Sequence, residues 1–516
     1  MRIFPAALTV AALLLGSTAI AAEATREENI AKCSDANLDV SIAGCSALLQ
    51  ASGESNEARA TAFNNRGVAY RDKADYDKAL QDFDEALKLA PSDVGTLVHR
   101  GRAYRGKGDH ARALADFDAA IKADPKGANA FTQRGLAFAD KGDVPRAIAD
   151  FDQAIALNPN AVDALYNRGV TLLDRGEIDK ALADFDATLK LAPTFAAAYI
   201  NRGVIWGRKG DHDRAIADYD QAVRYSPRSA NAFNNRGIAF YLKRLYDRAI
   251  QDFDAALAIN PNDTLALDNR GNAFRMKSEF DGAIESYNAV LKINPNSVGT
   301  LVNRGMSYTG KYDYDLAIAD FDQALKLSPT SAAALNNRGL AYNGKENFER
   351  AIQDFTAALK INPKLAGALN GRGNSQFLLA RYDAAAADLT ATLALDPNRP
   401  YAVMWLHLAR LKAGGPNASE LARNAAKIDM EAWTGKIVSF YMGKIDLTAL
   451  RLASGVGSVE QKGDQQCELA YYWAQDEIFK KNTQMGIELL KEAVEICLPS
   501  FIERLAATAE LKRLGQ

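Results

Sequence analysis

The chain is poor in the side chains that most often bind metals or carry out catalysis. It has only four His and four Cys among 516 residues. No pair of them has a spacing typical of zinc ligands, and no Ser or Cys has a candidate general base near it. The sequence therefore indicates neither a metal site nor an activated nucleophile, and we expect no enzymatic activity and no cofactor.

The sequence also lacks an excess of charge of one sign. It has 62 Lys and Arg against 64 Asp and Glu, a formal net charge of −2. Proteins that bind nucleic acid or anionic membranes usually carry a basic excess, so we expect no nucleic-acid partner. A chain of this length is too long for one compact core, so we expect several units or an elongated array.

Long apolar runs are absent after the first 22 residues. Residues 1–22 are typical of a secretory signal, with Arg2, an apolar stretch over residues 6–15 and a small-x-small cleavage site at residues 19–21. The stretch is shorter than the roughly 20 residues that cross a bilayer. A lipid anchor would need a Cys directly after it, but the first is Cys33. We expect an exported protein with no membrane insertion after cleavage, periplasmic or, alternatively, secreted.

What the sequence does contain is a long repeat. Arg-Gly recurs every 34 residues in ten copies without a slip, starting at Gly67. An Ala follows each Gly after 12 residues, starting at Ala79, and a Pro closes each copy, starting at Pro91. Four residues after the Ala stands an aromatic residue in nine copies, and Leu389 in the tenth. If the Gly is numbered position 8, the copies occupy residues 60–399.

This period and these positions resemble the tetratricopeptide repeat. The resemblance implies an all-α solenoid, a right-handed superhelix of helix–turn–helix repeats in which each copy has a helix A and a helix B. Gly and Ala at positions 8 and 20 let the two helices approach closely, the ring at position 24 fills the space between hairpins, and Pro at position 32 stops helix B. Such solenoids expose a concave groove lined by A helices, and their terminal units are modified to meet water.

A modified unit is predicted at the N-terminal end, over residues 23–59. One period before Gly67 and Ala79 stand Cys33 and Cys45, which therefore take positions 8 and 20 of a degenerate hairpin. These positions make the closest contact between helices A and B, and an even number of Cys in an exported chain favours disulfides. We predict a Cys33–Cys45 bond, with two buried thiols as the alternative.

A second modified region follows the tenth copy. Residues 400–466 contain a degenerate repeat, with His407 in the Gly position, and connecting helices. Residues 467–516 contain one more hairpin and a capping helix whose charged residues are expected to face solvent. Cys467 and Cys497 fall at positions 1 and 31, the open end of that hairpin, where a disulfide could close it.

This C-terminal part resembles the end of a family of bacterial envelope tetratricopeptide proteins that includes a lipoprotein adaptor of peptidoglycan hydrolases. The similar segments are Phe440-Tyr441-Met442-Gly443, the hairpin that starts at Cys467, and Phe501-Ile502-Glu503 followed by Glu510-Leu511. The chain departs from that family in its longer repeat array and in having no Cys for lipid attachment. The resemblance implies an alternative function, an architectural or assembly adaptor of the cell envelope that acts through its ends or convex face.

Charged side chains recur at two positions of the repeat. Arg stands at position 7 of all ten copies, and Asp stands at position 23 of nine. Position 7 lies where helices A and B meet, so we predict a repeated structural ion pair, with partner contact as the alternative. Asp82 and Asp84 flank the ring of the first copy, but residues two apart on a helix point to different sides. They therefore do not form a catalytic carboxylate pair.

Position 6 carries polar side chains that could bind a peptide. The residues are Asn65, His99, Gln133, Asn167, Asn201, Asn235, Asn269, Asn303 and Asn337. Position 6 faces the groove in tetratricopeptide proteins, and Asn there grips the ligand backbone in the long superhelices that bind extended polypeptides. A carboxamide offers a donor and an acceptor, which match one peptide unit whatever its side chain. The alternative is that Asn merely tolerates an exposed position or caps a neighbour.

The neighbouring positions argue against capture of a C-terminal carboxylate. As the resemblance describes that mode, it needs Lys at position 5 and Asn at position 9, whereas the first copy has Asn64 and Val68. The sequence thus predicts an exported, non-enzymatic scaffold that binds extended peptide or protein partners in its groove. It leaves the partner's identity and the oligomeric state open.

Overall fold

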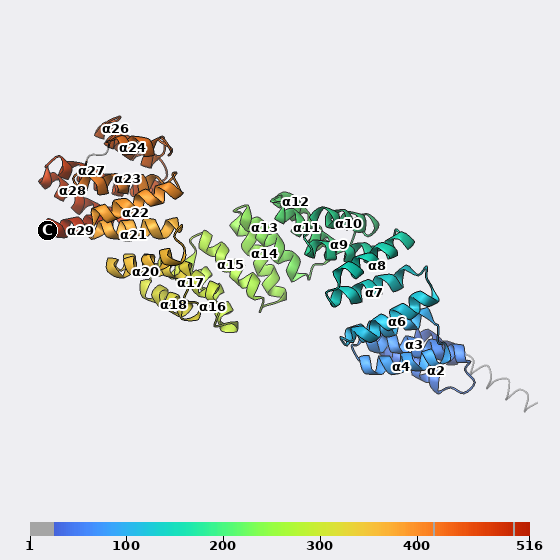
Figure 1. Ribbon diagram of the computed structural model, residues 1–516. Helices are drawn as coiled ribbons and strands as arrows, with labels where there is room; N and C mark the ends of the chain where they lie inside the picture. Colours follow the sequence, from blue (N-terminus) through green and yellow to red (C-terminus); the bar gives the residue numbers. More distant parts are fainter. Residues whose placement is uncertain (1–24, 416–417, 499–500) are drawn as a thin grey trace, which may run out of the picture. The chain divides into compact units, whose positions relative to one another are not determined.

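The computed structural model describes residues 25–415, 418–498 and 501–516, and Figure 1 shows it as a ribbon. Every regular element in these ranges is a helix, which confirms the predicted all-α class. None of these helices is both long and apolar enough to cross a membrane. The predicted signal at residues 1–22 lies outside the described residues.

The helices come in consecutive pairs that follow the predicted copies. Residues 25–33 are helical and pair with α2 (Leu38–Gln50). The A helices of the ten copies are α3 (Asn56–Asp72), α5 (Val94–Gly106), α7 (Ala128–Asp140), α9 (Val162–Asp174), α11 (Ala196–Arg208), α13 (Ala230–Leu242), α15 (Thr264–Met276), α17 (Val298–Gly310), α19 (Ala332–Gly344) and α21 (Ala366–Leu378). The B helices are α4 (Tyr76–Leu89), α6 (His110–Ala123), α8 (Val144–Leu157), α10 (Ile178–Leu191), α12 (His212–Tyr225), α14 (Tyr246–Ile259), α16 (Phe280–Ile293), α18 (Tyr314–Leu327), α20 (Phe348–Ile361) and α22 (Tyr382–Leu395).

The chain divides into two compact units, Met1–Ala239 and Phe240–Gln516. Within each unit the core is a series of small clusters around the buried rings of position 24, such as Phe117 and Phe185 in the first unit and Phe321 in the second. Each cluster draws its residues from adjacent helices. Stability in such an array comes from contacts within a repeat and with its nearest neighbours.

The Gly of position 8 makes room for the ring of position 24 in the same copy. A Cβ atom added to Gly67 would lie 2.7 Å from Phe83, and one added to Gly305 would lie 2.7 Å from Phe321. A side chain therefore does not fit between helix A and the ring. Phe83 also packs against Ala103 of the next helix A, so the ring fills the space between hairpins as predicted.

Each turn between helices A and B places position 15 in the left-handed region. In the first copy φ of Ala74 is 59°, and the N–H of Asp75 donates to the carbonyl of Tyr70 at 2.8 Å, closing a Schellman-type helix end. Gly is favoured in this conformation, since a side chain there costs about 1–2 kcal/mol. Six copies nevertheless carry another residue, namely Ala74, Arg244, Ser278, Tyr312, Glu346 and Ala380.

Replacing Ala74 by Gly is therefore expected to stabilise the α3–α4 hairpin by about 0.5–1 kcal/mol. The backbone strain that the change relieves is larger in free energy than the extra conformational entropy that Gly gives the unfolded chain. Amide hydrogen exchange in α3 and α4 should slow about two- to fivefold. Gly108→Ala, at the same position of the next copy, should speed exchange in α5 and α6. Unchanged exchange in both variants would contradict this account of the turn.

The region after the tenth copy consists of seven helices. These are α23 (Pro400–Lys412), α24 (Ala418–Ala425), α25 (Trp433–Tyr441), α26 (Leu447–Ala453), α27 (Val459–Phe479), α28 (Thr483–Ile496) and α29 (Ile502–Arg513). The boundary predicted between residues 466 and 467 falls inside α27. That helix begins earlier because Ser458 and Gln461 form a capping box at its N-terminus.

The predicted orientation of the capping helix is confirmed only in part. Leu505 and Leu511 of α29 pack against the core as predicted, but Glu503 and Glu510 are only 2% and 7% exposed instead of facing solvent. The carboxylates tolerate burial because each has a partner: the hydroxyl of Tyr472 donates to Glu503 at 3.0 Å, and Lys412 pairs with Glu510 at 2.6 Å. An amphipathic pattern cannot reveal these partners, which lie far away in the sequence.

Candidate functional site on the A helices

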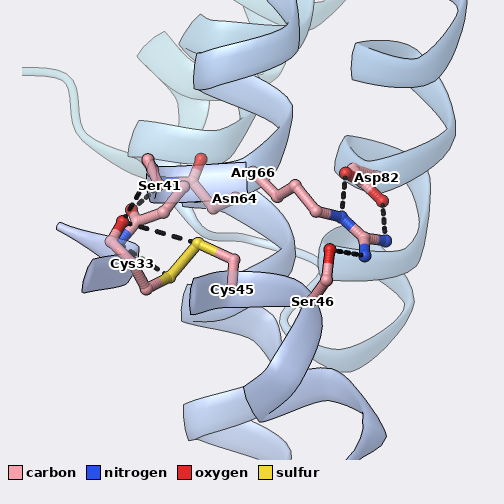
Figure 2. The surroundings of a disulfide bond; sticks show 8 residues. Cys33, Ser41, Cys45, Ser46, Asn64, Arg66 and Asp82 are labelled. Atoms are coloured by element: carbon pink, nitrogen blue, oxygen red, sulfur yellow. Dashed lines mark hydrogen bonds and ion pairs between the residues drawn. A yellow bond between two sulfur atoms is a disulfide. The ribbon is translucent and has the colours of Figure 1, made fainter. Parts of the chain in front are cut away.

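Both predicted disulfides are present in the structure. Cys33 and Cys45 join the helix of residues 25–33 to α2, with their Cα atoms 4.5 Å apart (Figure 2). Cys467, which lies inside α27 and not at its start, is bonded to Cys497, directly after α28, with a Cα separation of 4.9 Å. Closing a loop of about a dozen residues stabilises a fold by roughly 3 kcal/mol, which supports an end unit that packs on only one neighbour.

A cavity lies beside the N-terminal disulfide. It has a volume of about 290 Å³, and its lining includes Ile30 and Cys33 of the degenerate hairpin and Thr61, Ala62 and Asn65 of α3. Asn65 is one of the predicted peptide-binding residues. The cavity therefore lies between the helix of residues 25–33 and α3, and Leu48 of α2 also lines it.

The Asn side chains of position 6 are half-buried rather than fully exposed. The amides of Asn167 and Asn337 donate to carbonyls of their own helices, those of Asp163 and Ala333, at 2.7 and 3.0 Å. Each of these bonds uses one amide hydrogen and fixes the side chain. Among the described residues, neither Asn167 nor Asn337 accepts a hydrogen bond through its amide oxygen.

Other position-6 side chains contact a neighbouring A helix or their own. The amide of Asn201 donates to the hydroxyl of Tyr166 at 3.0 Å, and that of Asn235 donates to Asn231, also at 3.0 Å. Asn65 lies 4.0 Å from the sulfur of Cys33. Asn269 and Asn303 are half-buried at the equivalent positions of α15 and α17. Hydrogen bonds within or between A helices thus hold the amides of Asn167, Asn201, Asn235 and Asn337 in place.

The two substitutes for Asn in this series are more enclosed. Burial lowers the pKa of His99 to about 4, so the ring is neutral at physiological pH. Its Nδ1 lies 3.0 Å from the amide oxygen of Asn64. Gln133 is 8% exposed and accepts a hydrogen bond from Arg105 at 3.3 Å. Both therefore act as packed parts of the A-helix surface.

The Arg of position 7 forms the predicted ion pair with Asp of position 23. In the second copy, Nε and Nη2 of Arg100 donate to the two oxygens of Asp116 at 2.9 and 2.6 Å. The side chain of Asp116 is 7% exposed and that of Arg100 is 23% exposed. Such a bidentate pair within one copy ties helix A to helix B.

The same Arg also reaches the preceding copy. Nη1 of Arg100 donates to Asp84, at position 25 of the copy before, at 2.7 Å. In the first copy, Arg66 pairs with Asp82 in the same way (Figure 2). Its contact with the preceding hairpin is a hydrogen bond to Ser46 of α2, which accepts at 2.9 Å in place of an Asp. The Asp-Phe-Asp motif therefore serves two arginines, one in its own copy and one in the next.

Copies that lack one Asp keep the contact through another oxygen. Ser286 stands at position 23 of its copy and accepts from Arg270 at 3.0 Å, while Asn288 accepts from Arg304 at 2.6 Å. Thr356 accepts from Arg372 at 3.2 Å. The arginines of position 7 thus have a structural role within each unit. This supports the interpretation of a repeated structural ion pair over that of a partner contact.

Comparisons with known proteins agree with this architecture. Family models of the tetratricopeptide repeat match residues 60–93, 98–161, 132–196, 206–264, 298–331 and 332–365. Together these ranges cover half of the chain. The chain belongs to the tetratricopeptide-repeat family. Its fold is an all-α tetratricopeptide solenoid, and proteins of this family typically act as scaffolds for protein–protein interactions.

Several solved structures are similar to parts of the chain, while a comparison with curated proteins found no match. MamA is 30% identical over 31% of this chain and 94% of its own, with a TM-score of 0.28. A tetratricopeptide protein from Parabacteroides merdae is 20% identical over 48% and 99%, with a TM-score of 0.37. YrrB, described as having an unusual peptide-binding site, is 24% identical over 36% and 95%, with a TM-score of 0.33.

One partly buried acid on the A helices was not singled out from the sequence. Asp268 stands at position 5 of α15 and accepts a hydrogen bond from Thr300 of α17 at 2.9 Å. Burial raises the pKa of Asp268, an effect that the hydrogen bond partly offsets. Position 5 varies too widely along the repeats to draw attention by recurrence. In the part of the chain that the structure describes, no group of three or more His, Cys, Asp or Glu could hold a metal ion.

Proposed function

We propose that the protein is an exported tetratricopeptide scaffold that binds extended peptide or protein segments along the A helices of its repeats. The observation that carries the proposal is the recurrent amide at position 6. In Asn167 and Asn337 one amide hydrogen is held by the helix itself, and the oxygen accepts no hydrogen bond from any described residue. An ordered amide loses little side-chain entropy when it binds a peptide unit.

Two further observations support this proposal. The cavity beside the N-terminal disulfide includes Asn65 and lies between the helix of residues 25–33 and α3. Disulfides persist mainly in oxidising compartments, which favours the periplasm or the extracellular space over the cytosol.

Site-specific photocrosslinking in cells that produce the protein tests where partners bind. A photoreactive residue at Thr61 or Asn129, both exposed at position 2 of an A helix, is expected to crosslink to polypeptides. The same residue at Gln81 or Gln153, exposed on B helices, is the matched control and should give few crosslinks. Crosslinks mainly from the B helices would instead favour the envelope adaptor that works through its convex face.

A further inference from the structure

The second unit contains a cavity outside the repeats. It lies where α23, α25, α27 and α29 meet and has a volume of about 440 Å³. Its lining includes Tyr401, Trp433, Asp464, Glu468, Phe501 and Glu503. None of the described residues that line it is Lys, Arg or His. The cavity therefore combines three aromatic rings with three carboxyl groups and no basic side chain.

Glu468 is held firmly at the wall of this cavity. It is 4% exposed, and its two oxygens accept hydrogen bonds from the hydroxyl of Tyr401 at 2.7 Å and the indole N–H of Trp433 at 2.9 Å. Burial raises the pKa of Glu468, and these two hydrogen bonds counteract part of that effect. The two aromatic side chains are thereby fixed beside the carboxyl group.

Glu503 is the second buried acid of the cavity, and no described Lys, Arg or His pairs with it. It is 2% exposed, and Oε1 accepts from the hydroxyl of Tyr472 at 3.0 Å. Its own backbone N–H also stabilises the ionised carboxylate. Burial, with a smaller contribution from the charge of Glu468, raises the pKa of Glu503 to about 8. A buried carboxyl group without a neighbouring cation is costly to ionise. A bound cation would lower this cost.

We propose that this cavity binds an organic cation, an ammonium or guanidinium group such as the end of a Lys or Arg side chain of a protein partner. Carboxylates give such a group charge-assisted hydrogen bonds, and aromatic faces attract it through their quadrupole. Cavities of roughly 300–1,000 Å³ are typical of sites for small ligands, and this one falls in that range. A bare metal ion fits less well, since no described cluster has metal-ligand geometry.

Binding of the cation should be linked to the loss of a proton. The titratable groups around the site are Tyr401 on α23, Asp464, Glu468 and Tyr472 on α27, and Glu503 on α29. Burial raises the pKa of Tyr401 and Tyr472, which therefore stay neutral. Glu503 is mainly protonated at pH 7 and would ionise when the cation binds. Affinity should thus rise with pH, by up to about tenfold per unit below pH 8.

Calorimetry on the full-length protein tests the proposal with Nα-acetyl-lysine amide, n-butylammonium and the uncharged Nα,Nζ-diacetyl-lysine amide. The two cations should bind, and the diacetyl compound should bind at least about tenfold more weakly, since it lacks the charge. Tighter binding of the lysine amide would indicate a protein side chain as the natural ligand. Tighter binding of butylammonium would indicate a free small amine.

Three variants make the test specific. Glu503→Gln, which mimics the protonated acid and should fold, is expected to lose about tenfold in affinity and its pH dependence. Asp464→Asn should also weaken cation binding, and it tests the cavity without changing the buried Glu503. Glu510→Gln is the matched control, because Glu510 is buried in the same helix but pairs with Lys412 outside the cavity. Equal binding of charged and uncharged probes, or unchanged affinity in both Glu503→Gln and Asp464→Asn, would overturn the proposal. The site does not depend on the position-6 amides, so variants there should leave cation binding unchanged.

Discussion

Replacing Asn167, Asn201, Asn235, Asn269 and Asn303 together by Ala is expected to abolish micromolar peptide binding while the fold survives. One net hydrogen bond contributes roughly 0.5–1.5 kcal/mol, so Asn201→Ala alone should weaken binding only a few-fold. Five such losses amount to several kcal/mol, and a micromolar dissociation constant corresponds to only about 8 kcal/mol. Ala is a good helix former, and the local hydrogen bonds of these half-buried amides are modest in energy.

Calorimetry with several unrelated extended peptides measures this effect, and circular dichroism checks the fold. The loss should be similar for all sequences, because contacts with the peptide backbone carry little sequence information. A matched control replaces five exposed amides of B helices by Ala: Gln81, Gln153, Gln251, Gln323 and Gln353. If the folded Asn variant bound peptides as tightly as the wild type and this control, groove binding would be refuted and the architectural alternative favoured.

Breaking the ion pair of Arg100 and Asp116 is expected to destabilise the first unit strongly. Removing one partner leaves the other enclosed without its counter-charge, which costs about 3–5 kcal/mol for a buried pair. Both oxygens of Asp116 are engaged and its side chain is 7% exposed, so Asp116→Ala should approach this range. Asp84→Ala should cost under about 1 kcal/mol, because that side chain is 47% exposed.

A double-mutant cycle on Arg100 and Asp116, followed by denaturant unfolding, separates the pair from its surroundings. Losing both partners should cost clearly less than the sum of the two single losses. The exposed pair of Lys88 and Glu85, with side chains 68% and 49% exposed, is the control and should show a coupling under about 1 kcal/mol. Simple additivity for Arg100 and Asp116 would mean that the repeated pairs of position 7 with position 23 contribute no interaction energy to stability.

The repeats were largely predictable from the sequence because their packing is local. The small residue of position 8 and the ring of position 24 belong to one copy, as Gly67 and Phe83 show, and the period then repeats that contact. The Cys33–Cys45 disulfide followed from the same period, since it takes two positions whose contact is already known from the other copies. The ion pair of position 7 with position 23 was predictable for this reason as well.

Contacts between copies were harder to foresee. The sequence shows Asp84 as clearly as Asp82, but it does not reveal that Asp84 accepts from the Arg of the next copy. That partner depends on how one hairpin stacks on another, which the hydrophobic pattern of a single copy does not specify. The role of the left-handed turn at Ala74 also became visible only in the backbone.

The sequence by itself determined the all-α class, the ten hairpins and the Cys33–Cys45 disulfide, because a strict period repeats one local packing arrangement in every copy. Only the tertiary structure decided the C-terminal region, where no period operates. There, Tyr401 meets Glu468 across 67 residues, and Lys412 meets Glu510 across 98. Such long-range pairs bury Glu503 and Glu510 on the inner face of α29, although charge alone would place them in water. Burial of a carboxyl group depends on the partner that satisfies it, and that partner is set by the three-dimensional packing of the helices.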